Sequence, residues 1–90
     1  MVALTQSSLD KLELLFKEQG YRLRFEKGSF RTGACMLQNS KVIVVNKFSS
    51  VDVKVQSLIQ IFLGIPIEEE LIEEKLRPFY QQIKKTNITV

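Results

Sequence analysis

Residues 30–47 have the sequence FRTGACMLQNSKVIVVNK, which predicts two β-strands joined by a tight turn. The apolar residues are mostly small or β-branched, and such side chains fit the pleated surface of a strand. Asn39 and Ser40 lie at the centre of the stretch, and asparagine tolerates the positive φ that a two-residue hairpin turn requires. We therefore expect strands near residues 30–38 and 41–47.

This turn fixes which side chains share a face, because side chains alternate along a strand and directly opposed residues point the same way. One face would carry Cys35, Leu37, Val42 and Val44. The other would carry Ala34, Met36, Ile43 and Val45. Both faces are apolar, so residues 42–45 should be buried on both sides. The set that the helices leave uncovered is the candidate interface. The sequence leaves both sets open, and the possible interface that we name is Cys35, Leu37, Val42 and Val44.

A helix is predicted over residues 6–19, followed by an edge strand. The apolar residues at helical spacing are Leu9, Leu12, Leu15 and Phe16. Ser7 fits the N-cap, and Gly20 stands where a left-handed residue often ends a helix, with Tyr21 then contacting Phe16. Residues 21–26 alternate between apolar and charged side chains, which is typical of a half-exposed strand at the edge of a sheet.

Two further helical segments are predicted in the second half of the chain. Residues 51–63 carry an apolar face and end before Gly64. A third helix should start at Ile65-Pro66, with several glutamates near its N-terminus. Its inward residues would be Leu71, Ile72 and Leu76. Pro78 lacks an N–H, so we expect a kink or a restart there.

Together these elements predict an α+β fold in one domain spanning residues 1–90. Its sheet would be a three-stranded antiparallel meander, in the order α-β-β-β-α-α. Helices 6–19 and 51–63 would cover one face. The second apolar face would be covered either by residues 67–83 or by another copy of the chain.

The composition excludes several kinds of chemistry. The chain has no histidine, which removes the commonest general base and nearly every ordinary zinc site. The single cysteine, Cys35, cannot form an internal disulfide, and its neighbours Ala34 and Met36 offer no base to activate a thiolate. We interpret it as a small buried hydrophobic residue, and we predict no catalytic residue, metal or cofactor.

The absence of a leader sequence and of a long apolar run favours a cytoplasmic protein without a membrane segment. A glutamate-rich stretch, residues 68–74, could in principle hold a hard cation, but it lacks an aspartate-rich loop with an embedded glycine. We interpret it as a solvated helix N-terminus.

Basic residues gather in one half of the chain. Residues 21–54 hold seven basic and two acidic side chains, within a chain of net charge +3. A nucleic acid or an acidic partner would contact Arg22, Arg24, Lys27, Arg31 and Lys47. Tyr21 and Phe25 alternate with the arginines and so face away from them, which leaves this charge without a stacking platform.

One pattern resembles a known family. Gly20-Tyr21 before a strand, Gly33, and a Val42–Asn46 strand followed by a helix resemble the core of HExxH zinc peptidases of the phage-immunity regulator type. Gln56 and Gln60 stand where those proteins carry the two histidines, and Ser57 replaces the glutamate. The resemblance therefore implies a degenerate domain that binds a peptide without cleaving it. The whole chain also resembles short bacterial proteins of unknown function.

The hypothesis that these observations favour is a non-enzymatic protein-interaction module that self-associates, as a homodimer, through the sheet or the C-terminal helices. The apolar second face and the separation of basic and acidic halves both favour a symmetric contact. Nucleic-acid binding at the basic edge and peptide binding beside Gln56 and Gln60 are the alternatives.

Overall fold

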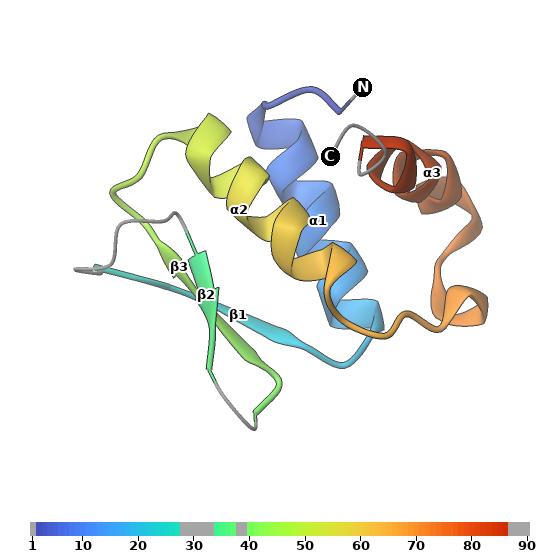
Figure 1. Cartoon of the computed structure of the whole chain (residues 1–90), viewed down its shortest axis with the longest axis horizontal. Helices are drawn as coiled ribbons and strands as arrows, with labels where there is room; N and C mark the ends of the chain where they lie inside the picture. The colour runs from blue at the N-terminus through green and yellow to red at the C-terminus, as the bar shows by residue number, and fades with distance from the viewer. Residues whose placement is uncertain (1, 28–33, 38–39, 87–90) are drawn as a thin grey trace.

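The computed structural model of the chain describes residues 2–27, 34–37 and 40–86 (Figure 1). Its elements are α1 (Gln6–Glu18), β1 (Arg22–Glu26), β2 (Ala34–Met36), β3 (Val42–Asn46), α2 (Val51–Leu63), the 3-10 turns η1 (Glu69–Leu71) and η2 (Glu74–Leu76), and α3 (Arg77–Thr86). The predicted α+β class is confirmed.

The first two helices lie where the sequence predicts them. α1 begins after Thr5, whose Oγ1 accepts a hydrogen bond from the Ser8 N–H at 3.4 Å, so the predicted cap at Ser7 is wrong by two residues. α2 covers Val51–Leu63, and Gly64 follows as its C-cap.

The end of α1 is the predicted Schellman motif. Gly20 has φ +86°, a left-handed conformation that favours glycine. The Tyr21 N–H donates to the Phe16 carbonyl at 2.9 Å, and the Gly20 N–H donates to the Lys17 carbonyl at 3.0 Å. The rings of Phe16 and Tyr21 meet edge to face, with centroids 6.2 Å apart. This ending turns the chain directly into β1.

The sheet is mixed, so the predicted antiparallel meander is wrong. Its strand order is β1-β3-β2, with β1 parallel and β2 antiparallel to β3. β3 is the most apolar of the three strands, and the central position lets it use both of its edges for hydrogen bonds while one face is fully buried. The predicted edge position of β1 agrees with this order.

The hairpin register is as predicted. Ala34 opposes Val45, and Cys35 opposes Val44. The Leu37 N–H also donates to the Val42 carbonyl at 3.0 Å. Asn39 of the predicted turn lies outside the described residues, as do residues 28–33.

Helices α1 and α2 cover the same face of the sheet (Figure 1). Ile43 and Val45 are fully buried on that face, and Ala34 is 5% exposed. Val42 and Val44 point the other way and are half-buried. β3 is therefore buried on one side only, contrary to the sequence-based expectation.

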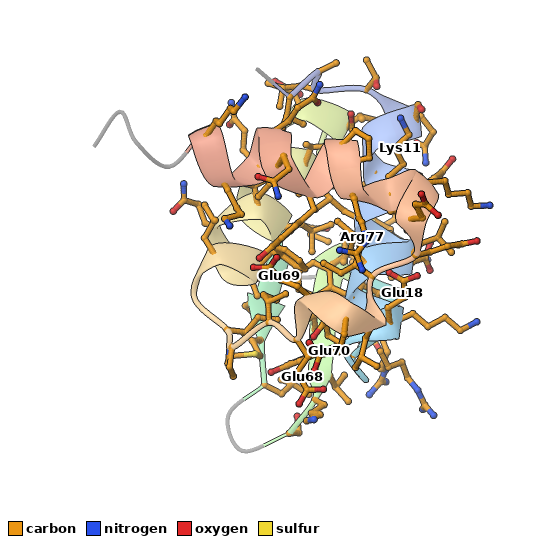
Figure 2. All side chains as sticks on the ribbon, turned by 90° about the vertical axis from the view of Figure 1, so that its right-hand side faces the viewer. Lys11, Glu18, Glu68, Glu69, Glu70 and Arg77 are labelled. Atoms are coloured by element: carbon orange, nitrogen blue, oxygen red, sulfur yellow. The ribbon has the colours of Figure 1, made fainter. Side chains whose placement is uncertain are left out.

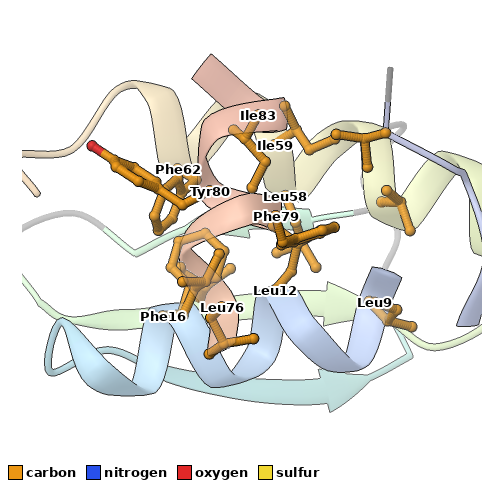
Figure 3. Close-up of a cluster of buried hydrophobic side chains, with 14 of the residues drawn as sticks. Leu9, Leu12, Phe16, Leu58, Ile59, Phe62, Leu76, Phe79, Tyr80 and Ile83 are labelled. Atoms are coloured by element: carbon orange, nitrogen blue, oxygen red, sulfur yellow. The ribbon is translucent and has the colours of Figure 1, made fainter. Parts of the chain in front are cut away.

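α3 packs on the helices, away from the sheet. The Tyr80 and Phe62 rings meet edge to face, with centroids 5.9 Å apart (Figure 3). The Lys11 ammonium lies 5.5 Å from the centre of the Phe79 ring. Ile83 is fully buried in the same cluster. Residues 67–83 thus complete the helical core, and the expectation that they could wrap behind the sheet is wrong.

The predicted helix from Ile65-Pro66 is absent, and η1 and η2 take its place. Leu71 is 48% exposed, whereas Ile72 and Leu76 are buried as predicted. Pro78 lies in the first turn of α3, where its missing N–H costs nothing, so the chain starts a helix there instead of kinking one.

Side chains at the end of α1 bind the backbone of this segment. The Gln19 amide accepts the Glu68 N–H at 2.8 Å and donates to the Glu68 carbonyl at 3.1 Å. The Glu73 N–H donates to the Glu18 carboxylate at 3.1 Å. The Glu68 carbonyl also accepts the Leu71 N–H at 3.1 Å, in the 3-10 turn η1. Glutamates at four-residue spacing would also repel one another along a helix.

Candidate functional site

The face of the sheet that the helices leave uncovered carries the candidate site, and we call it the open face. Strand alternation and cross-strand register define its members. They are Arg22, Arg24, Glu26, Cys35, Leu37, Val42, Val44 and Asn46. Both sets of residues that the sequence singled out contribute to this face, the apolar hairpin residues in full and the basic residues in part.

The open face has an apolar centre with a charged flank. Val44 lies between Arg24 on β1 and Cys35 on β2. Val42 and Cys35 are half-buried, like Val44, while Arg24 is exposed. Arg22 is the cross-strand neighbour of Val42. The arginine stems can therefore cover valine while the guanidinium groups stay in water, which is how long basic side chains commonly shield apolar surface.

Arg24 and Glu26 form an ion pair along β1. Their side chains are 53% and 42% exposed, so this pair contributes little to stability and leaves both groups available to a partner. Arg22 makes no ion pair with any described residue. Interactions within the described chain therefore neutralise the charges of β1 only weakly.

The remaining basic residues predicted as contacts do not join this group. Lys27 and Lys47 are exposed just beyond the ends of β1 and β3. The Lys47 ammonium lies 5.4 Å from the centre of the Phe48 ring. Arg31 lies outside the described residues. The structure brings together two of the five predicted basic contacts, Arg22 and Arg24, on the open face.

β1 lies at the edge of the sheet, as its alternating pattern predicts, and its outer backbone groups were not considered as a contact surface. The Arg22 N–H donates to the Lys41 carbonyl at 2.8 Å, and the Glu26 carbonyl accepts the Lys47 N–H at 3.0 Å. Because backbone groups alternate in direction along a strand, those of Leu23 and Phe25 point away from β3. Among the described strands, β1 has β3 as its only neighbour.

A hollow of about 370 Å³ lies beside this edge. Its lining comes from the second half of α1 and the start of β1, namely Glu13, Lys17, Gly20, Tyr21, Arg22 and Leu23. Phe25, on the helix side of the same strand, is 38% exposed. The sequence signal for this site is the alternation of Arg22, Arg24 and Glu26, which marks both an edge strand and a charged flank.

The other residues that the sequence singles out lie outside the hollow beside α1 and β1. Cys35 is half-buried on the open face, whereas the sequence predicts a buried residue. Gln56 and Gln60 are exposed on α2, away from the hollow beside α1 and β1. Figure 2 shows Glu18 and Arg77 beside the glutamate segment, where the Arg77 guanidinium donates to the Glu69 carbonyl at 3.2 Å.

Within residues 2–27, 34–37 and 40–86, no three acidic or thiol side chains gather closely enough to bind a metal ion. In that same part of the chain, no helix combines the length and apolar character needed to span a bilayer.

We compared the chain with family models, with curated proteins and with solved structures, and none of the three comparisons found a match. The open face and the β1 edge are therefore the features from which a function has to be argued.

Proposed function

We propose that this chain is a non-enzymatic protein-interaction module that self-associates through its sheet. The observation that carries the proposal is the uncovered side of β3. Both central helices lie on the opposite face, and residues 67–83 pack on those helices, so no described segment covers Val42 and Val44. A partner would cover the side of β3 that carries Val42 and Val44.

The charge pattern supports a second copy as that partner. Arg22 and Arg24 share one strand and one face with Glu26, so the sheet carries both signs within a few residues. A two-fold contact brings each patch against its own copy, and a patch of mixed charge can satisfy itself in that way. A patch of one sign would repel its copy.

The first prediction is concentration-dependent association at micromolar protein, measured by sedimentation equilibrium. Amide hydrogen exchange at low and high concentration locates the contact. We expect protection to rise in β1, β2 and β3 while α3 stays unchanged, because α3 lies away from the sheet. A monomer at all concentrations, or protection confined to α3, would overturn the proposal.

Nucleic-acid binding is the second candidate, favoured by the shared face of Arg22 and Arg24. Against it, Phe25 lies on the helix side, and the described open face holds no aromatic side chain for base stacking. Sedimentation with a single-stranded oligonucleotide at low salt separates the two candidates. Co-sedimentation that weakens steeply with salt, and that Arg22→Ala with Arg24→Ala abolishes, would favour nucleic acid.

A further inference from the structure

We propose that two copies of this chain pair their β1 strands antiparallel, with the two-fold axis passing at Phe25. The result is one continuous six-stranded sheet, three strands from each copy. This inference rests on the proposed function, because it gives a register to self-association through the sheet. The contact lies at the edge of β1 and leaves Val42 and Val44 on the open face uncovered.

The backbone of β1 supplies the first step. The residues whose backbone groups face β3 are Arg22, Arg24 and Glu26, as the bonds to Lys41 and from Lys47 show at the two ends. Leu23 and Phe25 therefore direct their N–H and C=O groups outward. In an antiparallel pair centred on Phe25, that residue exchanges both of its backbone hydrogen bonds with its own copy. Leu23 does the same with Lys27 of the second copy.

The side chains supply the second step. With the axis at Phe25, Arg24 stands directly opposite Glu26 of the second copy, and the symmetry repeats this contact. The two residues form a pair without backbone hydrogen bonds, in which Cα atoms approach to about 4.5 Å and side chains meet closely. Their present ion pair within one strand is exposed and weak, so exchanging partners costs little.

Charge selects this register over its neighbours. Other registers are possible if residues with outward backbone groups still oppose one another. The two-fold axis can then shift along β1 by one residue at a time. Moving it to Arg24 places that guanidinium opposite its own copy, and moving it to Glu26 does the same for the carboxylate. Like charges directly opposite each other destabilise a strand pair, so both shifts are penalised. The same charges discourage indiscriminate pairing of an exposed edge.

The space beside the strand permits the contact. Phe25 is 38% exposed on the helix side, and pairing would bury it against its own copy. Leu23 lines the hollow between α1 and the start of β1, so there is open space beside this residue. Glu13 and Lys17 line that hollow, so each copy brings one acidic and one basic side chain toward the junction.

A charge-exchange experiment tests the register. We expect Arg24→Glu alone, and Glu26→Arg alone, to raise the dissociation constant about tenfold or more, because each places two like pairs across the axis. The double exchange Arg24→Glu with Glu26→Arg restores opposite charges and should return the constant to within about threefold of the parent. Circular dichroism confirms that each variant is folded.

A second measurement separates failure of this inference from failure of the proposed function. On association, the amides of Leu23 and Phe25 should gain protection from hydrogen exchange. With Cys35→Ser as background, Phe25→Cys should cross-link copies under mild oxidation, while Phe48→Cys, at an aromatic that is 69% exposed elsewhere, should not.

Three results are decisive against the β1 pairing. Association without protection at Leu23 and Phe25, a double exchange that stays dissociated, or equal cross-linking at both cysteine positions would each overturn it while leaving self-association through the sheet intact. A strictly monomeric parent protein would overturn both.

Discussion

Gln19 links two parts of the chain that are distant in sequence. Its side chain is 8% exposed, and its amide makes both a donor and an acceptor contact to the backbone of Glu68. A primary amide presents the same donor and acceptor pair as a peptide group, so Gln19 takes the place of a neighbouring strand residue for that one position. It holds the glutamate segment against the end of α1.

We expect Gln19→Leu to lower the free energy of unfolding by about 1–2 kcal/mol, because two hydrogen bonds are lost while the Glu68 backbone can still reach water. Urea denaturation measures this change. The variant should also be cut faster by a glutamate-specific protease between residues 68 and 74. Gln60→Leu on the exposed face of α2 is the matched control, and equal behaviour of the two variants would contradict this role.

Sequence patterns predicted many individual positions of the core but not this one. Leu12, Leu15 and Phe16 are fully buried, as their helical spacing indicates. A glutamine at the end of a helix carries no such periodic signal, because its partner lies 49 residues away. Helical spacing predicts Leu71 on the inner face, but the segment forms the 3-10 turn η1, in which Leu71 is 48% exposed.

At the scale of elements, the Schellman ending of α1 sets the direction of β1. Gly20 holds φ +86°, and a Cβ there would meet Lys41 Nζ at 3.7 Å, an ordinary contact. The cost of a side chain at this position is therefore conformational and not steric. The tight turn places Tyr21 on Phe16 and starts β1 one residue later.

We expect Gly20→Ala to destabilise the protein by about 1–2 kcal/mol, the cost of a left-handed L-residue. Thermal or urea unfolding checks the value. Gly64→Ala is the control, because Gly64 caps α2 at φ −94° and its added Cβ meets only Ile61 and Gln60 carbonyls at 3.5–3.6 Å. A Gly20 variant as stable as its Gly64 counterpart would show that the left-handed ending is not required.

Contacts between residues close in sequence could be predicted, whereas contacts between distant strands could not. The hairpin register follows from its turn and from alternation, so Cys35 was correctly placed opposite Val44. The parallel pairing of Arg22 with Val42 depends on which strand is best buried in the centre, and no turn residue encodes it. The apolar residues of the open face could be named from the hairpin alone. That Arg22 and Arg24 share this face with them follows only from the pairing of β1 with β3.

At the scale of the whole molecule, helices cover one side of the sheet, and no segment that the structure describes covers the other. Phe16, Phe62 and Tyr80 form a chain of edge-to-face aromatic contacts through the helices, with centroids 5.3 Å and 5.9 Å apart. The Tyr80 hydroxyl donates to Glu69 Oε2 at 3.3 Å, which fixes the glutamate segment to α3. Burial, together with the negative charge and hydrogen bond of Glu69, raises the pKa of Tyr80 above its ordinary value of 10.0.

This shift predicts a loss of stability at high pH. A raised pKa in the folded state means that the folded protein binds more protons than the unfolded one above pH 10, so the contribution of Tyr80 is complete below that pH and falls as the pH rises through the folded-state pKa. We expect the melting temperature to drop more steeply above pH 10 in the parent protein than in Tyr80→Phe. Parallel curves for the two proteins would contradict this link, since lysine titration affects both equally.

The central place of β3 also determines when the sheet can assemble. β2 and β3 adjoin in sequence, and such a hairpin can form locally within microseconds. β1 contacts β3 in parallel, joining Arg22 to Val42 across 20 positions, so that contact must await closure of the intervening chain. During synthesis α1 and β1 leave the ribosome before β3 exists. We therefore expect β1 to dock after the hairpin has formed, and slow docking would leave it exposed to other nascent chains.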